Sequence, residues 1–279
     1  MIEAVPYTAL VTDPTPFRIE ERKQELSDCF TLTLRPSVNS GSFTFAPGQF
    51  NMLYAFGHGE VPISMSGNPA DSNILVHTIR NVGSVTAALQ KLKVGDTVGI
   101  RGPFGRSWPL EAAKGKNILV IAGGLGLAPL RPAIYYLLAH RSDYGTIDLL
   151  NGTRDPSSIL FADELEEWAQ SINVSLTVDS ATPGWKGQVG VVTDLLPQQD
   201  SFQNTVALVC GPEIMMRFCA YALLDRGLAS EDIYVSMERN MKCAIGFCGR
   251  CQYGSYFICH DGPVFSFDRV ERLFKIREV

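Results

Sequence analysis

The sequence predicts a small antiparallel β-barrel, then a doubly wound α/β domain with a parallel sheet, and last a short cysteine-rich segment. Three observations on its 279 residues predict this division. Apolar and polar positions alternate in short runs as far as about residue 110, whereas longer apolar strands alternate with helical stretches beyond it. Four of the seven cysteines then fall between Cys243 and Cys259.

The runs of the first domain are CFTLTL, NMLYAF, ILVHTIR and DTVGIRG, punctuated by glycine and proline in APGQ and RGPFG. Such alternation is typical of strands that bury one face, and several of them separated by turns form a barrel. The polar stretch EAAKGK is the expected linker. The second domain then begins with the strand NILVIAG, the turn GLGL and the helix APLRPAIYYLLAHR, and continues with apolar strands between helices. This order favours a parallel sheet covered on both faces.

Composition and charge disfavour several classes of protein. A formal net charge of -5 gives no basic surface for nucleic acid. No apolar run reaches the roughly 18 residues of a membrane-spanning helix, and the first residues lack the pattern of a signal peptide. We therefore expect a cytoplasmic protein without a membrane span. In a reducing compartment the crowded cysteines favour metal binding over disulfides.

Cys243, Cys248, Cys251 and Cys259 follow the spacing C-x4-C-x2-C-x7-C. The first three match the plant-type pattern for a 2Fe-2S cluster, and glycines within the loop let the backbone approach the sulfides. A structural zinc site is the alternative, although zinc more often uses two separated C-x2-C or Cys/His pairs. His260 is expected to be a neighbour of the cluster, because four thiolates complete the ligand set.

Two glycine turns indicate a nucleotide site. Gly123, Gly124 and Gly126 connect the first strand of the second domain to its helix, where a pyrophosphate can approach backbone amides. A tight turn without a ligand is the alternative, because GGLGLAP is not GxGxxG. Gly211 also follows a strand and precedes a helix, so both turns are expected at the same edge of the sheet. The candidate set is completed by Ala128, Pro129, Cys210 and Pro212.

The segment GSVT in the first domain resembles a helix start that binds an anion. Gly83, Ser84 and Thr86 precede an apolar helical run and offer amides and hydroxyls to a phosphate. An ordinary helix N-cap is the alternative interpretation.

Together these motifs resemble the ferredoxin-NADP reductase superfamily, in which a flavin-binding barrel precedes a nicotinamide-binding domain. The cysteine loop makes the chain most similar to the electron-transfer subunit of dihydroorotate dehydrogenase and to the gamma, or diaphorase, subunit of cytosolic nickel-iron hydrogenases (sulfhydrogenases); the sulfite reductase B subunit is similar too. The resemblance implies an FAD-binding antiparallel β-barrel at 1–112, an NAD(P)-binding α/β domain at 113–236 and a 2Fe-2S cluster-binding segment at 237–279.

The resemblance also assigns flavin contacts. VPISMS resembles the signature R-x-Y-S and its R-P-I-S variant, so Ser64 would hydrogen-bond the flavin ring and Ile63, next to Pro62, would pack on it. Val61 stands where many relatives have Arg; Arg80 would replace that charge or be an exposed strand-end residue. Three residues would run along the ribityl chain and pyrophosphate, namely His77, Thr78 and Ile79.

In the same family GGLGLAPL grips the nicotinamide nucleotide, and Cys210 would lie near the nicotinamide ring or be a buried strand cysteine. Arg154 ends the strand LLNGTR near the expected adenosine ribose and favours NADPH, whereas Asp155 would favour NADH if it turned inward. Glu238 would lie near the flavin or pair with Arg239.

The resemblance implies a diaphorase subunit that moves electrons between NAD(P)H, FAD, a 2Fe-2S cluster and the catalytic and iron-sulfur subunits of a partner complex. A nickel-iron hydrogenase is the preferred partner, because MIEAVPYTALVTDP resembles the start of hydrogenase gamma subunits. Alternatives are the electron-transfer subunits of dihydroorotate dehydrogenase or sulfite reductase, and, from another class, a flavin-free regulatory or structural subunit. Hydride transfer needs no protein acid, base or nucleophile, so no catalytic side chain is assigned.

Overall fold

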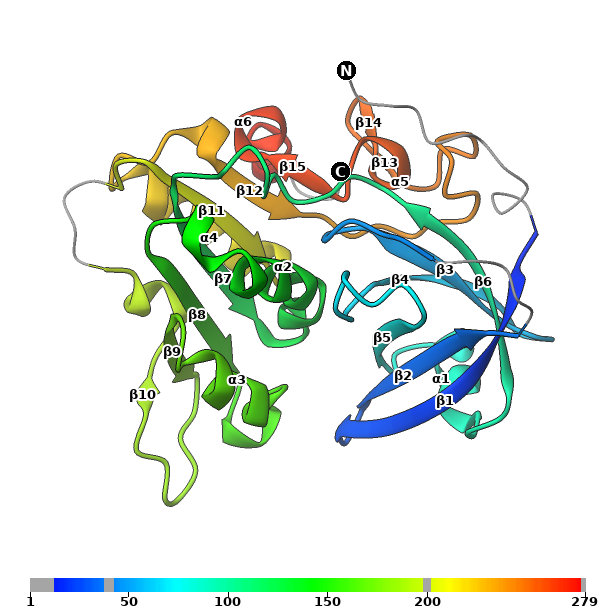
Figure 1. Cartoon of the computed structure of the whole chain (residues 1–279). Helices are drawn as coiled ribbons and strands as arrows, with labels where there is room; N and C mark the ends of the chain where they lie inside the picture. The colour runs from blue at the N-terminus through cyan, green and yellow to red at the C-terminus, as the bar shows by residue number, and fades with distance from the viewer. Residues whose placement is uncertain (1–12, 38–42, 198–201, 277–279) are drawn as a thin grey trace.

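The computed structural model describes residues 13–37, 43–197 and 202–276, and its two sheets lie side by side with the cysteine-rich segment above the barrel in the view of Figure 1. The first sheet has six antiparallel strands in the order β4-β3-β6-β1-β2-β5. A bridge between Met65 and His77 joins its two edges and closes the barrel that the sequence predicted. The elements of this half are β1 (Thr15–Leu26), β2 (Cys29–Pro36), β3 (Phe50–Ala55), β4 (Gly59–Ser64), β5 (Leu75–Arg80), α1 (Ser84–Lys91) and β6 (Thr97–Phe104).

The barrel core forms because alternate residues of each strand point inward. Phe17 and Ile19 of β1 are completely buried or nearly so, while Arg18 between them and Glu20 and Glu21 after them are exposed. β1 is not among the strands that the sequence pattern predicts, because charged residues dominate its second half. Its twelve residues pair with both β2 and β6 and hold the sheet together.

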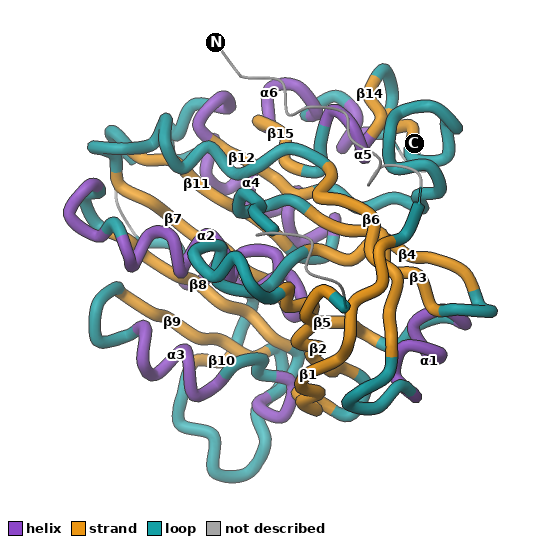
Figure 2. Tube along the Cα trace, turned by 45° about the vertical axis from the view of Figure 1, so that its right-hand side comes forward, coloured by secondary structure: helices purple, strands orange, loops and turns teal. Residues whose placement is uncertain are grey.

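The second sheet has the order β10-β9-β8-β7-β11-β12-β15 and is parallel except for β15. Both faces of β7 are buried: Ile118 and Val120 face α2 and α3, whereas Leu119 and Ile121 face α4 (Figure 2). The expected parallel sheet with two covered faces is confirmed. Its elements are β7 (Asn117–Gly123), α2 (Leu127–Ala139), β8 (Ile147–Thr153), α3 (Ala162–Trp168), β9 (Asn173–Val178), β10 (Gln188–Val189), β11 (Thr205–Cys210), α4 (Glu213–Leu224) and β12 (Ile233–Ser236).

The cysteine-rich segment follows β12 and then returns to the second sheet. It contains a small hairpin, a helical turn, the edge strand β15 and a second helical turn, and β15 pairs antiparallel with β12 through Val235 and Phe265. The sequence did not predict β15, because three residues carry too little periodicity. These elements are β13 (Gln252–Tyr253), β14 (Tyr256–Phe257), α5 (Ile258–Asp261), β15 (Val264–Ser266) and α6 (Phe267–Val270).

Short 3-10 turns complete the described structure. They are η2 (Gly124–Gly126), η3 (Arg141–Asp143), η4 (Pro156–Ser158), η5 (Val192–Leu195), η6 (Ser230–Asp232) and η7 (Leu273–Lys275). Over the described ranges, no helix has both the length and the apolar character needed to cross a bilayer.

Candidate cofactor sites and the cysteine loop

The four cysteines of the predicted metal site come together in the loop between β12 and α5 as two pairs of thiols. Cys243 and Cys248 are close enough to influence each other's pKa, and so are Cys251 and Cys259. Within the described residues, no three His, Cys, Asp or Glu side chains converge as ligands of one ion. Two pairs of sulfurs match a cluster in which each of two irons takes two thiolates.

Backbone amides of this loop point at the sulfur atoms. Phe247 and Cys248 each donate an N–H to Cys243 Sγ at 3.3 Å, and Gly246 donates to Cys259 Sγ at 3.1 Å. Partial burial raises the pKa of the Cys243 thiol, but the N–H groups of Ile245, Cys248 and Phe247 outweigh it and hold that pKa at about 7. The loop can bend this way because Gly246 has a φ of +74°. The donor set therefore fits an anionic iron–sulfur centre.

The four thiols differ in solvent exposure, from buried inside the loop to exposed at its surface. Cys251 and Cys259 are buried, Cys243 is half-buried and Cys248 is exposed. Phe247 beside it is 87% exposed. One end of the centre therefore faces outward, on the side of the segment away from its packed core.

The two glycine turns of the second domain lie against each other, as the sequence predicted. A Cβ on Gly126 would stand 2.2 Å from the carbonyl oxygen of Cys210, and a Cβ on Gly211 would stand 3.0 Å from Cα of Gly123. Pairing of Cys210 with Ala122 places both turns at the carboxyl ends of neighbouring parallel strands. The edge thus presents the amino ends of α2 and α4 together, where an anion is stabilised by backbone N–H groups.

Helix α2 begins without a side-chain cap, because Gly126 occupies the N-cap position and Ala128 and Pro129 follow in its first turn. The N–H of Leu127 already donates to the carbonyls of Gly124 and Leu125 in η2, and Pro129 has no N–H, so few donors of this first turn are left for a ligand. Cys210 is 3% exposed, and burial raises the pKa of its thiol while its side chain hydrogen-bonds Ser236. The side chain of Cys210 thus has the environment of a buried strand cysteine.

The strand that carries Pro62, Ile63 and Ser64 is an edge strand of the barrel order. Each of its six residues is half-buried, whereas β2, β3 and β6 bury most of theirs. An edge strand with this uniform partial exposure suits a flat ligand laid along it.

On the neighbouring strand β5, the side chains that were expected along the ribityl chain and pyrophosphate make contacts within the barrel instead. The ring of His77 is completely buried, with Nδ1 at 3.0 Å from the carbonyl of Ser64 and Nε2 at 3.2 Å from the Asn51 amide. Thr78 Oγ1 bonds the hydroxyls of Thr31 and Ser66. These two side chains therefore serve the barrel, together with Ile79 in its core, and a ligand along β5 would meet the backbone.

In the GSVT segment, one residue caps helix α1 and two others border open space. Thr86 Oγ1 accepts the N–H groups of Val82 and Gly83 at 3.0 and 2.9 Å, so this hydroxyl acts as a helix cap. Gly83 and Ser84 are exposed, and a Cβ on Gly83 would meet no atom within 4 Å. Room for an anion therefore exists beside Gly83, with Ser84 rather than the capped Gly83 amide as the donor.

Charged candidates at the rim also have defined positions. Arg154 is exposed directly after β8, and the Asp155 carboxylate accepts hydrogen bonds from the hydroxyls of Ser157 and Ser158 at 2.6 and 3.0 Å. Asp155 therefore faces its own turn. Arg80 is an exposed strand-end residue, 3.6 Å from the carboxylate of Asp28.

Glu238, which was expected near the flavin or paired with its neighbour, is exposed. The next residue, Arg239, donates to the Glu213 carboxylate at 3.1 Å and to the backbone carbonyl of Glu238 at 2.8 Å. Arg239 thereby connects the entrance of the cysteine loop to the first turn of α4.

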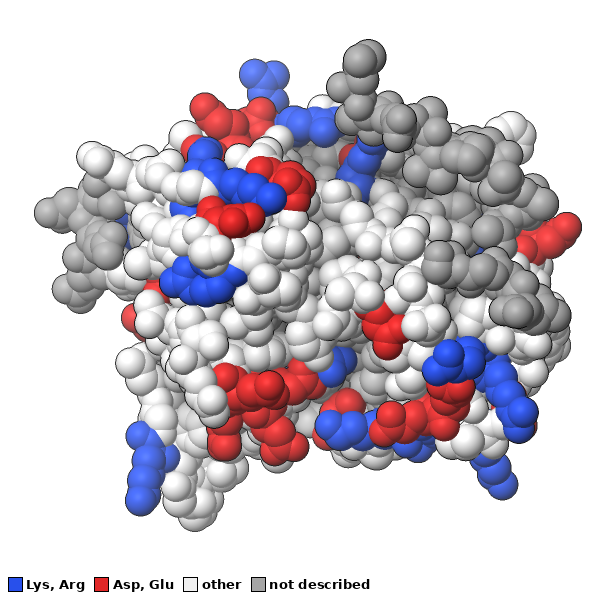
Figure 3. Space-filling view, viewed as in Figure 1, with Lys and Arg blue, Asp and Glu red and all other residues white. Residues whose placement is uncertain are grey.

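Two arginines that the sequence analysis did not select link the parts of the molecule. Arg101 of β6 binds Glu60 and the cysteine loop, and Arg131 of α2 binds Ser66 of the barrel. A signal existed for Arg101, since a charged residue inside an apolar strand needs a buried partner. Figure 3 shows that charges gather toward the edges of this face, while the middle, over the junction of the two halves, is largely uncharged.

Three stretches of the chain match known protein families. Residues 16–108 match the oxidoreductase FAD-binding domain, residues 120–221 the oxidoreductase NAD-binding domain, and residues 238–271 the iron-sulfur cluster binding domain of dihydroorotate dehydrogenase B. Fold and site thus define an oxidoreductase that binds FAD, a nicotinamide nucleotide and an iron–sulfur cluster.

Curated relatives and a solved structure extend over most of the chain. Sulfhydrogenase 2 subunit gamma of Pyrococcus furiosus is 39% identical over 85% of this chain and 88% of its own. A probable dihydroorotate dehydrogenase B (NAD(+)) electron transfer subunit from the same organism is 38% identical, covering 81% and 82%. A chain in the structure of NADH-dependent reduced ferredoxin-NADP oxidoreductase aligns over 98% of this chain and 96% of its own with 27% identity and a TM-score of 0.71.

The chain belongs to the ferredoxin-NADP reductase-like family of FAD- and NAD-binding oxidoreductases that carry an iron–sulfur domain of the dihydroorotate dehydrogenase B type. It is an electron-transfer subunit of that family.

Proposed function

We propose that this chain is the diaphorase subunit of a complex of the nickel-iron hydrogenase (sulfhydrogenase) type, and that it moves electrons between NAD(P)H, FAD and a 2Fe-2S cluster. The observation that carries the proposal is the cysteine loop, in which backbone N–H groups point at the sulfurs of Cys243 and Cys259 while the thiol of Cys248 is exposed. Similarity to sulfhydrogenase 2 subunit gamma over 88% of that protein supports the choice of complex.

The two-iron type of cluster is favoured over zinc by the arrangement of the thiols. A structural zinc site brings four ligands to one tetrahedral centre. Here Cys243 and Cys248 form one pair while Cys251 and Cys259 form another, and each pair suits one iron. Direct N–H donation to sulfur also stabilises the additional negative charge of such a cluster.

For the flavin, we propose that β4 provides the contact surface, with Ser64 as hydrogen-bonding group and Ile63 beside it. The amide and hydroxyl of Ser84 at the start of α1, beside the open space at Gly83, would receive the pyrophosphate. Val61 leaves no charge at its own position. The match to an FAD-binding domain and the half-buried edge of β4 favour this assignment over a flavin-free regulatory subunit.

For the nucleotide, we propose the joined turns of Gly124–Gly126 and Gly211–Pro212, which offer two helix amino ends to the phosphates. When bound, the nicotinamide and flavin supply hydride chemistry and the cluster supplies one-electron transfer. The residues of this chain orient these groups, exclude water and set their potentials. Cys248, as the exposed ligand, would mark the side of the loop on which the partner's first centre docks.

The partner is the finer part of the proposal, because the hydrogenase and dihydroorotate dehydrogenase relatives are 39% and 38% identical. The N-terminal stretch whose resemblance favoured a hydrogenase lies almost entirely outside the described residues. Anaerobic affinity purification from the native cell tests the partner: hydrogenase subunits should be recovered with the chain, and recovery of a dihydroorotate-oxidising subunit in their place would contradict the proposal.

The cofactor content is tested on the purified protein itself. We expect flavin absorption with the broader absorption of an iron–sulfur cluster, FAD after denaturing release, and about two irons with two acid-labile sulfides for each FAD. Zinc in stoichiometric amount without labile sulfide would contradict the cluster assignment and leave the flavin assignment intact.

A further inference from the structure

A buried guanidinium joins the proposed flavin strand to the cysteine loop. Arg101 lies on β6 opposite Met52 of β3, and its side chain is only 7% exposed. Its Nε and Nη2 donate to the two carboxylate oxygens of Glu60 on β4, at 3.0 and 2.8 Å. Glu60 directly precedes Val61, so the bidentate pair crosses β3 and is fixed to the strand of the flavin motif.

The same guanidinium also holds the cysteine loop. Nη1 donates to the carbonyl of Cys243 at 3.3 Å and Nη2 to the carbonyl of Lys242 at 3.2 Å. Cys243 is the first of the four thiols, and the N–H groups that follow it turn toward its sulfur. The loop thus directs its carbonyls toward the barrel and its amides toward the proposed cluster, with Ala244 between them at a φ of +63°.

We propose that Arg101 is a positioning residue for the iron–sulfur loop and that its buried charge raises the reduction potential of the cluster, with Glu60 opposing it. This inference rests on the proposed function. Uptake of one electron adds one negative charge to the cluster, and the electron comes from the flavin side of the same subunit. A cation at the carbonyl of a ligand residue stabilises the reduced form, whereas the carboxylate on its far side destabilises that form.

The pair makes a test in which the two variants shift the potential in opposite directions. Arg101→Gln removes the cation and leaves the Glu60 carboxylate, so the cluster becomes harder to reduce. Glu60→Gln removes the anion and leaves the cation, so the cluster becomes easier to reduce. We expect each to change the ratio of reduced to oxidised cluster by about tenfold at the original midpoint, roughly 59 mV for one electron.

The measurement is an equilibrium redox titration of the FAD-containing protein, with the cluster followed by electron paramagnetic resonance. Arg101→Lys, which keeps the charge, should stay near the unsubstituted potential, while amide exchange at residues 244–248 becomes faster because lysine cannot hold Glu60 and two carbonyls in one plane. Equal potentials in both glutamine variants, or shifts of the same sign, would overturn the inference.

If the Arg101→Gln protein does not retain a cluster, the Glu60→Gln protein provides the test, because it keeps the guanidinium at the loop. An unchanged cluster potential in Glu60→Gln would overturn the electrostatic role of the pair. If the unsubstituted protein contains no reducible cluster, that result contradicts the proposed function, and the role of Arg101 inferred from it is contradicted as well.

Discussion

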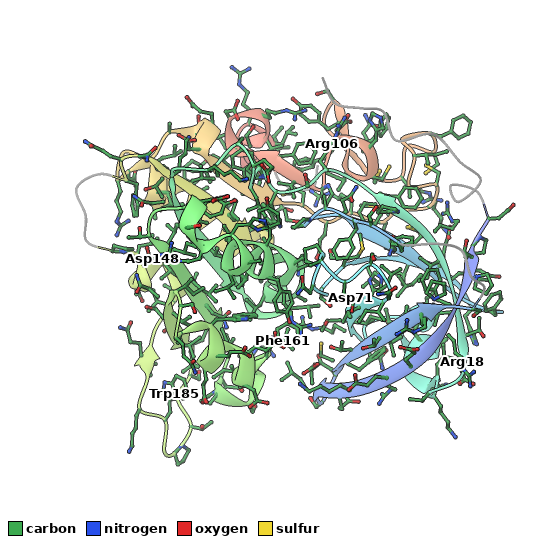
Figure 4. The ribbon with its side chains drawn as sticks, in the orientation of Figure 1. Arg18, Asp71, Arg106, Asp148, Phe161 and Trp185 are labelled. Atoms are coloured by element: carbon green, nitrogen blue, oxygen red, sulfur yellow. The ribbon has the colours of Figure 1, made fainter. Side chains whose placement is uncertain are left out.

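The guanidinium of Arg131 on α2 donates from Nη1 to the backbone carbonyl of Ser66 in the barrel at 3.0 Å. Its other nitrogens hold the carboxylate of Glu164 at 2.6 and 2.9 Å, and it lies over the ring of Phe161, 4.3 Å from the centroid. Figure 4 shows Phe161 at the junction between the two halves. One side chain therefore connects the helix behind the nucleotide turn to the end of the flavin motif.

Arg131→Met should loosen this junction. The substitution removes a mostly buried cation and leaves the Glu164 carboxylate, 20% exposed, with Tyr135 as its remaining donor. We expect a loss of about 2–3 kcal/mol in the free energy of unfolding. Urea unfolding followed by tryptophan fluorescence measures it. Arg217→Met, at a half-buried position of α4 where the guanidinium lies over the exposed ring of Phe218, is the control and should change little; equal effects of the two substitutions would show that the junction contact is unimportant.

Gly126→Ala should separate the two glycine turns. Its Cβ would stand 2.2 Å from the Cys210 carbonyl oxygen, so the backbone must move, at a cost of about 1–3 kcal/mol. Nucleotide affinity should fall at least tenfold while FAD content stays unchanged. Gly124→Ala is the matched control, because its Cβ meets nothing within 4 Å and it adds only the strain of a φ of +52°, about 1 kcal/mol. Nucleotide binding unaffected by Gly126→Ala would place the nucleotide elsewhere.

His77 should make the barrel sensitive to mild acid. Burial lowers the pKa of its ring from 6.5 to about 4. A histidine with a lowered folded-state pKa contributes its full stability above about pH 6.5 and loses it as the pH falls toward 4. The free energy of unfolding should therefore drop by about 2–3 kcal/mol between pH 7 and 4.5 through this residue.

Denaturant unfolding of the unsubstituted protein and of His77→Gln at both pH values isolates that contribution. The gap in stability between the two proteins should narrow as the pH falls. A gap that stays constant would mean that His77 keeps its neutral form for reasons other than burial, or titrates outside this range.

Arg154 should distinguish the two nicotinamide nucleotides. The carboxylate of Asp155 is bound to Ser157 and Ser158, which leaves Arg154 as the charged group at the end of β8. Arg154→Gln should raise KM for NADPH about tenfold, equivalent to about 1.4 kcal/mol, with little change for NADH. Steady-state dye reduction measures both values, and NADH is the internal control. Equal changes for the two nucleotides would contradict a role at the 2′-phosphate.

Features that depend on the pattern of one short segment could be predicted from the sequence. The strand before Gly123, the helix after Gly126 and the Cys243–Cys259 spacing each lie in one short segment, and the structure brings them together as expected. Links between distant segments had no such signal: Arg101 and Cys243 are 142 residues apart, and Arg131 and Ser66 are 65 apart. Periodicity within a segment cannot specify contacts of this range.

For a related reason, the His77 side chain lies inside the barrel and not along a flavin, where it was expected. The motif identified the correct strand, but the direction of each side chain depends on the register that closes the barrel at Met65 and His77. That register places the imidazole between Ser64 and Asn51 inside the sheet.

In the proposed function, electrons from NAD(P)H leave this subunit through the cysteine loop. Cys248→Ser tests it most directly, because Cys248 is the exposed thiol and serine is a poor ligand for the cluster. Cys219→Ala, a buried thiol of α4 outside the loop, is the control and should keep the cluster.

The measurement compares two rates in a Cys248→Ser protein shown to be folded and to contain its FAD. NAD(P)H-driven reduction of a dye that accepts electrons at the flavin should continue at the original rate, and transfer to the native partner should fall nearly to zero. Transfer to the partner at the original rate, from a protein without a cluster, would contradict the account.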